Sequence, residues 1–406
     1  MTLPGMASRG FSSAAGAAET AVSRSRDASF MGAGKRGHSA DVSSSAQSAS
    51  AGLRGRASCE MSAAMSDLHP LRIGIVGAGG IVKQRHLPGL RALPGISITA
   101  VANSTLASAE TFCHDHAPEA RPHSRWEDVV DNDDVDIVWI GAHPCLHHDA
   151  TCFALERGKH VFTQARMAAT LAEAERMWEK SRSFPELVTA ICPAPHGMRG
   201  GLMVKKLLAE GAIGVPLHAL LHSFNSDWLP ATQPAHWRQR TEISGIQILT
   251  LGIYIEVLQH WLGHITEVEA RGKVGIPVRG AYEVGTPDFL HVNAEFSGGL
   301  EAALLFSGVA AHAPTDKLWI FGSEGTLVYD FATEELALGK TGGSLEPVAV
   351  PQEMQRAWAV ERDFIGAVRN PSAPRPRPDF TEGLCYMRVV DAVWRAMETG
   401  AAARCV

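Results

Sequence analysis

The amino-acid sequence predicts an α/β protein in which a doubly wound parallel sheet is followed by an α+β domain with an open, mostly antiparallel sheet. From residue 70 to residue 191, short β-rich runs alternate with helical patterns, which is typical of parallel βαβ units. Beyond about residue 195, strand patterns follow one another through glycine-rich turns, which favours antiparallel pairing. We expect the first domain to span residues 68–192 and the second to span 193–406.

Apolar periodicity and turn residues locate the elements of each domain. In the first domain, strands and helices are expected to alternate over residues 72–76, 81–93, 96–102, 107–116, 136–140, 146–157, 160–163, 171–181 and 187–191. In the second domain, strands are expected over residues 266–273, 291–296, 300–306, 318–321 and 326–329, and closing helices over 352–368 and 381–398.

Residues 1–67 differ in composition from the rest of the chain. They are rich in Ser, Ala, Gly and Arg and contain too few apolar residues to offset the entropy lost on ordering, so we expect a disordered tail. Arginines set among serines also resemble an organelle transit peptide. Alternatively, translation begins at Met65, directly before the first strand. A cytoplasmic protein is therefore expected, or a mitochondrial or plastid one if the tail is a transit peptide.

Composition and charge limit the expected partners. The 406-residue chain has a formal net charge of -6, 45% hydrophobic and 20% charged residues, so nothing in its electrostatics favours nucleic acid or an anionic membrane. The seven cysteines are scattered without a C-x-x-C pair, which argues against a zinc knuckle or a disulfide framework, and no metal site is predicted. A small-molecule substrate is the expected partner.

A glycine-rich turn joins the first predicted strand to the first predicted helix. Its sequence is Gly77-Ala78-Gly79-Gly80-Ile81-Val82, which fits a dinucleotide-binding Rossmann fingerprint except that Val82 replaces the third glycine. Gly77 permits the tight turn, and Gly79 lets the backbone approach a pyrophosphate at the helix N-terminus that Gly80 and Ile81 begin. The alternative is a plain strand–turn–helix connection.

The end of the second predicted strand bears on the choice of cofactor. A NAD-specific site usually has a carboxylate there, which binds the ribose 2′-hydroxyl. This chain has Asn103, Ser104 and Thr105 instead, whose side chains can donate hydrogen bonds to a 2′-phosphate. The sequence therefore favours NADP slightly over NAD. The alternative is that these residues only form the N-cap of the following helix.

The order of these motifs over residues 70–400 resembles the Gfo/Idh/MocA oxidoreductase family. Besides the glycine turn, the resemblance is carried by His86-Leu87-Pro88, Gly158-Lys159-His160-Val161, Gly211-Ala212-Ile213-Gly214, Trp261-Leu262-Gly263, Gly322-Ser323-Glu324-Gly325-Thr326-Leu327 and Asp379-Phe380-Thr381-Glu382-Gly383. It implies a Rossmann domain, a C-terminal domain with an open sheet through which subunits often pair, and hydride transfer on sugars, polyols or related alcohols and ketones.

The sequence departs from the family at its catalytic lysine. Members usually have Glu-Lys-Pro after the fourth main strand, whereas this chain has Gln164, Ala165 and Arg166. The resemblance places Gln164 beside the cofactor and Ala165 at the lysine position. Arg166 is a candidate cation nearby, although an arginine cannot donate a proton at neutral pH. The alternative is a surface arginine at the end of a strand.

A second family signature, an aspartate, a glycine and a histidine on one helix, is matched by Thr250, Gly252 and Tyr254. Some members have tyrosine at the last position, so Tyr254 is the candidate proton donor or acceptor and Thr250 is a candidate substrate contact. Helical spacing predicts that Gln247, Thr250 and Tyr254 share one face. As a base, Tyr254 would need a nearby cation such as Arg166 or His236, and the alternative is a core tyrosine.

Two further segments resemble family loops. The resemblance implies that Pro144 and His147, after the third main strand, border the nicotinamide. Trp237 and Arg238 match a substrate-facing pair, with His236 beside them and His196 as a further candidate. His143 and His147 have the spacing of a metal motif, but no glutamate base accompanies them.

The sequence thus predicts an NAD(P)-dependent oxidoreductase acting on a sugar-like, polyol or cyclic alcohol or ketone substrate. One alternative is a ligand-binding or regulatory pseudoenzyme, because the family's lysine and aspartate are both missing. The other is a non-redox enzyme that recycles its NAD internally.

Overall fold

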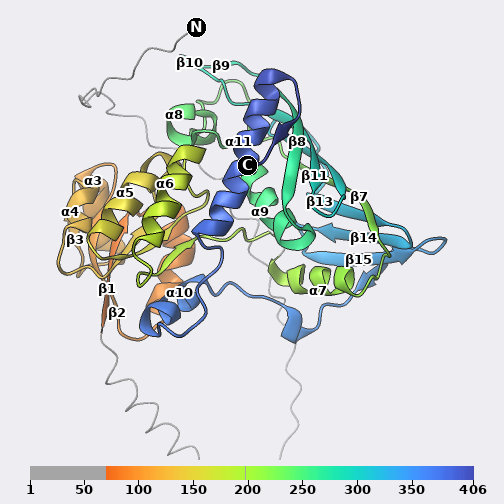
Figure 1. Ribbon diagram of the computed structural model, residues 1–406. Helices are drawn as coiled ribbons and strands as arrows, with labels where there is room; N and C mark the ends of the chain where they lie inside the picture. Colours follow the sequence, from red (N-terminus) through yellow and green to blue (C-terminus); the bar gives the residue numbers. More distant parts are fainter. Residues whose placement is uncertain (1–69, 197) are drawn as a thin grey trace, which may run out of the picture. The chain divides into compact units, whose positions relative to one another are not determined.

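The computed structural model describes residues 70–196 and 198–406, and Figure 1 shows how their elements are arranged. The tail predicted over residues 1–67 lies outside the described residues. Within the described part, no helix combines the length and the hydropathy that crossing a bilayer requires.

The first sheet is parallel, as predicted, and has the strand order β3-β2-β1-β4-β5-β6. Its chain order reverses between β1 and β4, which makes it doubly wound. One short strand, β3, has no counterpart in the sequence prediction, because three residues carry no periodic pattern. The strands are β1 (Leu71–Val76), β2 (Ile96–Ala102), β3 (Arg121–His123), β4 (Ile137–Ile140), β5 (His160–Thr163) and β6 (Thr189–Ile191).

The helices between these strands follow the prediction, except that a helix over residues 126–130 has no predicted counterpart and the helix expected over 81–93 is irregular. Residues 80–91 form one helical run, in which a π-helical segment, η1 (Val82–His86), is followed by the short helix α2 (Leu87–Arg91). Pro88 has no N–H to donate to the carbonyl of Gln84, so the regular α-helical ladder is broken there. The remaining helices are α3 (Leu106–His116), α4 (Trp126–Val130), α5 (Pro144–Glu156) and α6 (Leu171–Arg182).

The second sheet is mixed and mostly antiparallel, which confirms the predicted fold class. Its order is β16-β15-β14-β13-β7-β12-β11-β8-β17, and only the central pair β7 and β12 is parallel. The strands are β7 (Pro216–Phe224), β8 (Ile265–Lys273), β11 (Phe289–Phe296), β12 (Glu301–Ser307), β13 (Lys317–Gly322), β14 (Gly325–Asp330), β15 (Glu335–Lys340), β16 (Glu346–Val348) and β17 (Ala403–Arg404). A separate hairpin pairs β9 (Val278–Arg279) with β10 (Tyr282–Glu283).

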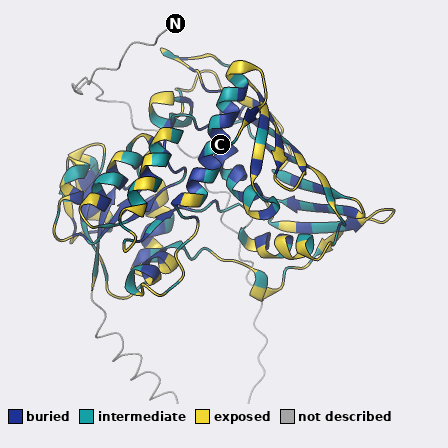
Figure 2. Cartoon of the chain, in the orientation of Figure 1, coloured by how far each residue is buried: buried dark blue, intermediate teal, exposed yellow. Residues whose placement is uncertain are grey.

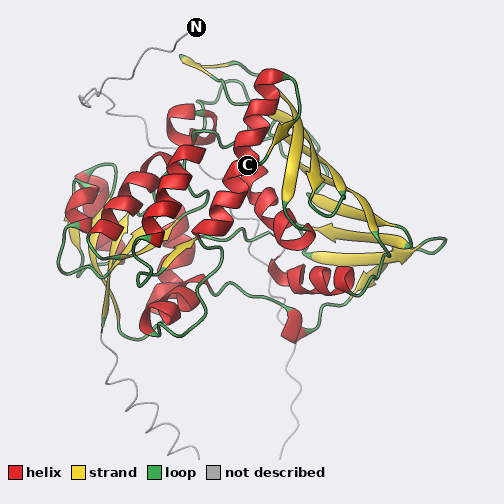
Figure 3. Cartoon of the chain, in the orientation of Figure 1, coloured by secondary structure: helices red, strands yellow, loops and turns green. Residues whose placement is uncertain are grey.

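Helices cover one face of this second sheet (Figure 3). The long helix α11 (Phe380–Thr399) packs on β8 and on α9 (Leu251–Leu262), while α7 (Met198–Ala209) reaches β15. Along β11 buried and more exposed side chains alternate, as a half-covered sheet requires. The buried residues form a continuous core between sheet and helices (Figure 2), so this core fixes the position of α9. Two short turns, η2 (Trp237–Gln239) and α8 (Thr241–Ser244), precede α9.

The prediction of one helix over residues 352–368 is wrong. A 3-10 turn, η3 (Gln352–Met354), and the helix α10 (Val360–Arg369) are separated by non-helical residues. The two pieces pack on different partners, since η3 contacts α7 whereas α10 contacts α2 of the first domain. Phe364 of α10 packs edge-on against Trp139 and Phe162 beneath the parallel sheet. Tertiary packing therefore overrides the continuous helical pattern.

Candidate cofactor and substrate site

Four strands of the parallel sheet end in one row. Val76 of β1 is in register with Ala102 of β2 and with Ile140 of β4, and Ile140 is in register with Thr163 of β5. The next residues along the chain therefore line a single edge, at the point where the strand order reverses. Open α/β sheets bind dinucleotides at such an edge.

The glycine turn occupies the centre of this edge. Gly77 has a φ of +86°, and a Cβ added there would lie 2.6 Å from the backbone nitrogen of Ala142, so only glycine fits. Added Cβ atoms at Gly79 and Gly80 would meet no atom within 4 Å. The outer face of the turn is therefore open where a side chain would stand, which fits the approach of a pyrophosphate. Ile81, at the start of the following turn, is exposed.

Asn103 supports the glycine turn directly. Its Oδ1 accepts a 2.7 Å hydrogen bond from the N–H of Ala78, and its Nδ2 donates to the carbonyl of Ser108. Thr105, not Asn103, caps α3 through the N–H of Ser108. The side chain of Ser104 is exposed. Asn103 thus holds the turn in place next to the position where a ribose would bind.

His147 lies behind the edge. It is fully buried, and its ring nitrogens lie 2.9 Å from the carbonyl oxygens of Ala142 and Arg166. Burial lowers the pKa of this imidazole, which favours the neutral form. The neutral ring has one N–H, so it donates to one of these two carbonyls, and His147 lies between the loops after β4 and β5, next to the buried Pro144 at the start of α5. Within the described part of the chain, no cluster of three or more His, Cys, Asp or Glu residues could hold a metal ion.

Gln164 also turns inward, at the end of β5. Its Nε2 donates to Nε2 of His86 at 2.5 Å, and Nδ1 of His86 in turn donates to Oε1 of Glu361 at 2.5 Å. The indole N–H of Trp358 binds the same carboxylate. This buried chain of hydrogen bonds fastens α10 to the cofactor edge, and Gln164 positions the loop that carries Ala165.

Arg166 is not a surface residue. It is 6% exposed, and its guanidinium forms an ion pair with Glu256 of α9. Burial alone would lower the pKa of Arg166, but the Glu256 carboxylate raises it, so the side chain stays charged. A Cβ on Gly252 would lie 2.8 Å from Cδ of Arg166, so this glycine lets the arginine cross the helix. The predicted cation is therefore bound to Glu256.

Tyr254 and Thr250 belong to a hydrogen-bonded cluster with Ser223 and Asp316. Tyr254 donates to Oδ2 of Asp316 at 2.6 Å, and Ser223 donates to the same oxygen at 2.7 Å. Thr250 lies 2.9 Å from the Ser223 hydroxyl. Because Ser223 already donates its hydroxyl hydrogen to Asp316, Thr250 is the donor to Ser223. Burial and the Asp316 carboxylate raise the pKa of Tyr254 well above its usual value, so Tyr254 remains protonated.

The predicted face of Gln247, Thr250 and Tyr254 is only partly right. Helix α9 begins at Leu251, with Thr250 as its N-cap, because Leu249 before it has a φ of +46°. Gln247 is therefore outside the helix and donates to the carbonyl of Ala168. Asp316 was missed altogether, since it belongs to no motif and only the pairing of β13 with β7 brings it beside Tyr254.

The remaining predicted residues fall into two places. His196 packs on Tyr254 with ring centroids 5.1 Å apart, and burial lowers the pKa of His196 to about 4.

The Trp237 ring lies 4.8 Å from His143, and the Arg238 guanidinium lies 4.4 Å from the centre of that indole. His236 is exposed and caps η2 by accepting from the N–H of Arg238. His143, which the sequence analysis considered only as part of a metal motif, thus links this segment to the cofactor edge.

This arrangement is typical of a two-domain, dinucleotide-dependent oxidoreductase: an open glycine turn at the switch point of a parallel sheet, joined through Arg166 to the helix that carries Tyr254. Residues 71–190 match a family model described as an oxidoreductase family with an NAD-binding Rossmann fold. Residues 202–328 match the model of the GFO/IDH/MocA C-terminal domain. The chain therefore belongs to the Gfo/Idh/MocA family of NAD-binding oxidoreductases, which confirms the predicted resemblance.

Named relatives include a sugar reductase and an inositol dehydrogenase. The chain is 29% identical over 317 residues to dTDP-3,4-didehydro-2,6-dideoxy-alpha-D-glucose 3-reductase of Streptomyces antibioticus, covering 74% of this chain and 89% of that protein. It is 26% identical over 193 residues to inositol 2-dehydrogenase of Salmonella typhimurium, covering 47% and 54% of the two proteins. It is 24% identical over 362 residues to the human glucose-fructose oxidoreductase domain-containing protein 2, covering 81% and 91%.

A solved structure supports the fold. Levoglucosan dehydrogenase in complex with NADH superposes with a TM-score of 0.74 at 19% sequence identity, covering 83% of this chain and 99% of that one. At this identity the likeness shows a shared fold.

Proposed function

We propose that the protein transfers hydride between a bound nicotinamide dinucleotide and an alcohol or carbonyl carbon of a sugar-like or polyol substrate. Family membership and the relatives named above support this reaction class. The observation that carries the proposal is the cluster at the N-terminus of α9, where Tyr254 and Ser223 both donate to Asp316. Oxidation of an alcohol releases a hydroxyl proton, and this carboxylate is positioned to accept it.

The residues of the parallel-sheet edge suit the dinucleotide. The open face of Gly79, Gly80 and Ile81 would hold the pyrophosphate, while Asn103 and Ser104 would lie next to the adenosine ribose. The loop that begins with Pro144 and the segment after Gln164 would border the nicotinamide, with His147 holding the two loops together. When bound, NAD supplies the hydride chemistry, and the protein supplies orientation and proton transfer. The preference for NADP over NAD remains a prediction.

Proton transfer is assigned to the pair Tyr254 and Asp316, with Asp316 as the acceptor. The side chain of Tyr254 is fully buried and its pKa is raised, so it favours the protonated form. Asp316 and Thr250 are partly exposed, so a substrate hydroxyl can reach them. Tyr254 and Ser223 orient the carboxylate, and no cation beside the tyrosine is needed. This differs from the role expected from the helix motif, in which Tyr254 itself is the base.

The other predicted residues receive supporting roles. Arg166 orients α9 through Glu256, and Trp237 and Arg238 form a platform next to His143 on which a sugar ring can stack. His236 and His196 lie at the margins of this region, and His196 packs on Tyr254. A substrate that binds here would lie between the cofactor edge and α9.

A second candidate function is supported by one observation. Ala165 occupies the family's lysine position, and Arg166 beside it is bound to Glu256, so neither supplies an ammonium group to the substrate. A protein that binds NAD and a sugar without net turnover, or that recycles its NAD internally, would also fit this arrangement.

Purified protein distinguishes these functions. Its absorbance spectrum reports bound nucleotide, and incubation with inositols, aldoses and anhydrosugars in the presence of NAD or NADP reports reduced cofactor at 340 nm. We expect net cofactor reduction with at least one of these classes. Product formation without net reduction would support internal recycling, whereas binding without product would support the pseudoenzyme.

We infer a homo-oligomer that pairs through the face of the second sheet opposite α11, and a cytoplasmic protein whose partner is a small molecule rather than nucleic acid or a membrane. Light scattering coupled to gel filtration tests the first point, and imaging of a tagged full-length chain tests the second.

A further inference from the structure

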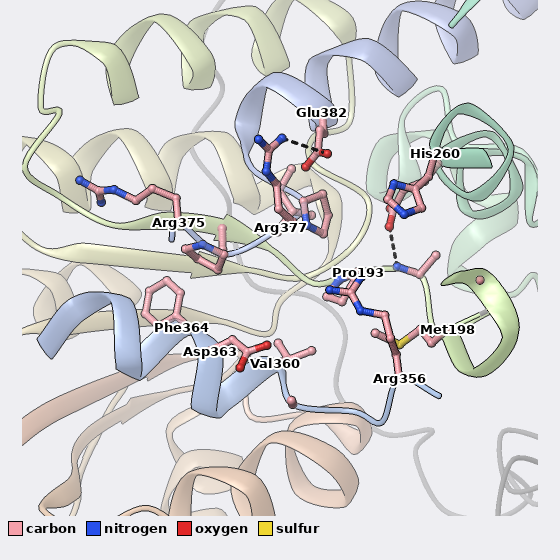
Figure 4. A pocket seen from close by; sticks show the side chains of 18 of the residues that line it. Pro193, Met198, His260, Arg356, Val360, Asp363, Phe364, Arg375, Arg377 and Glu382 are labelled. Atoms are coloured by element: carbon pink, nitrogen blue, oxygen red, sulfur yellow. Dashed lines mark hydrogen bonds and ion pairs between the residues drawn. The ribbon is translucent and has the colours of Figure 1, made fainter. Parts of the chain in front are cut away.

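A large cavity lies away from the cofactor edge. Its volume is about 1120 Å³, and it is enclosed by α7, the C-terminal part of α9, α10 and the proline-rich segment 370–378. None of the residues assigned above to the dinucleotide lines it, and His196 is the one substrate candidate that does. Figure 4 shows the cavity with side chains from these elements pointing toward it. The proposed reaction therefore does not account for this cavity.

More cationic than anionic side chains line the cavity. The carboxylates that line it are Glu256, Asp363 and Glu382, and each has a cationic partner: Arg166, Arg362 and Arg377 respectively. The cationic side chains of the lining are Lys205, Arg356, Arg362, Arg375 and Arg377. Arg375 donates to the carbonyls of Pro185 and Leu187. The acidic residues are thus already neutralised.

Two cationic side chains lie at the mouth of the cavity. Lys205 on α7 and Arg356 after η3 are exposed, and neither forms an ion pair with any residue of the described ranges 70–196 and 198–406. Both lie near His260. Burial lowers the pKa of this imidazole most, and the charges of Lys205, Arg356 and Arg377 lower it further. Positive charge therefore collects on one side of the opening, where it would attract an anion.

The inner wall of the same cavity is apolar. Among its apolar lining residues, Leu202 is 36% exposed, and Met198 and Val360 are partly exposed. Val257 and Trp261 extend this wall on α9. A ligand that fills the cavity would therefore bury an apolar body against these side chains while its charged group stays at the mouth.

We propose that this cavity is a second ligand site, which binds an organic anion with an apolar body. The carboxylate or phosphate group of the ligand is held by Lys205 and Arg356, and its body packs against Leu202 and Val360. The site is separate from the dinucleotide edge, so both ligands can bind together.

The test uses the full chain saturated with NAD and the fluorescent anion 8-anilinonaphthalene-1-sulfonate as probe. We expect saturable binding that NAD does not prevent. The double variant Lys205→Glu/Arg356→Glu should weaken the probe by about tenfold or more, since two charge-assisted contacts are lost. Decanoate and decyl phosphate should displace the probe, and their relative strength shows which head group the site prefers.

Lys206→Glu is the matched control, because Lys206 lies on the same helix, pairs with Glu210 at 3.9 Å and does not line the cavity. This variant should bind the probe like the unmodified chain. Thermal unfolding by circular dichroism verifies that both variants fold. Displacement of the probe by NAD alone, or equal weakening in Lys206→Glu and in the double variant, would overturn the proposal. Neither outcome depends on whether the protein turns over a sugar.

Discussion

The hydroxyl of Tyr254 donates a 2.6 Å hydrogen bond to Oδ2 of Asp316, which is 62 positions away in the sequence. Ser223 donates to the same oxygen, so one carboxylate oxygen accepts hydrogen bonds from two hydroxyl groups near the N-terminus of α9. Burial and the neighbouring carboxylate favour the neutral, protonated form of Tyr254. A tyrosine that acts as a base must instead be ionised. The proposed proton transfer is therefore assigned to Asp316.

The first prediction concerns this pair. Asp316→Asn keeps the shape of the side chain but removes its ability to accept a proton, so we expect kcat to fall by about 10²-fold or more, the usual scale for a lost general base. Tyr254→Phe should reduce kcat less, since Ser223 still orients the carboxylate. Steady-state kinetics with NAD measure both effects.

Tyr282→Phe is the control, because Tyr282 also donates to a carboxylate, that of Glu242, but at an exposed site. It should leave kcat unchanged. If Asp316→Asn retains full activity while Tyr254→Phe loses it, the tyrosine itself carries the proton and our assignment is wrong.

The second prediction separates two glycines of one turn. Gly77→Ala forces a side chain into the backbone of Ala142 at a positive φ, so it should lower the free energy of unfolding by about 1–3 kcal/mol. Gly79→Leu meets open space, so the fold should keep its melting temperature while NAD affinity is lost. Calorimetry and nucleotide titration measure the two quantities. Retained NAD affinity in Gly79→Leu would place the cofactor elsewhere.

The order of strands and helices was predictable because its signals are local. Each parallel strand except β3 carries a short apolar run, and the glycine turn at Gly77 follows directly from the sequence. The site was less predictable, because its contacts join distant segments. Gln164 turns inward to His86 because Glu361 arrives from α10, and no local pattern reveals that return of the chain. Asp316 was missed for the same reason, whereas Arg166 was correctly selected but its partner Glu256 was not.

The third prediction concerns the choice between NAD and NADP. Asn103→Asp keeps the oxygen that accepts from the N–H of Ala78, so the glycine turn should survive. The added negative charge should repel a 2′-phosphate and raise the ratio of NAD to NADP affinity. Asn103→Ala, which loses the bond to Ala78, should weaken both cofactors instead. An unchanged ratio in Asn103→Asp would remove the basis for the predicted NADP preference.

The fourth prediction concerns stability in acid. The pKa of His196 is lowered from 6.5 to about 4 by burial, so the native state holds the neutral ring while the unfolded chain binds a proton below pH 6.5. The stability that this difference contributes is present above pH 6.5 and is lost as the pH falls toward 4, by up to about 3 kcal/mol. His196→Gln should make urea unfolding less dependent on pH over this window.

The last prediction tests the buried ion pair between Arg166 and Glu256. Arg166→Met leaves the Glu256 carboxylate without its cation, and a stranded buried charge typically costs about 3–5 kcal/mol. Glu256→Gln should also be costly, because Arg166 would then be unpaired next to Tyr386. The double variant Arg166→Met/Glu256→Gln removes both charges and keeps an acceptor for the N–H of Ala194, so it should recover most of the stability.

The exposed pair of Lys340 and Glu324 is the matched control, and Lys340→Met should cost less than about 1 kcal/mol. Additive losses in the double variant, measured by chemical denaturation, would show that Arg166 and Glu256 act independently and that the arginine does not orient α9.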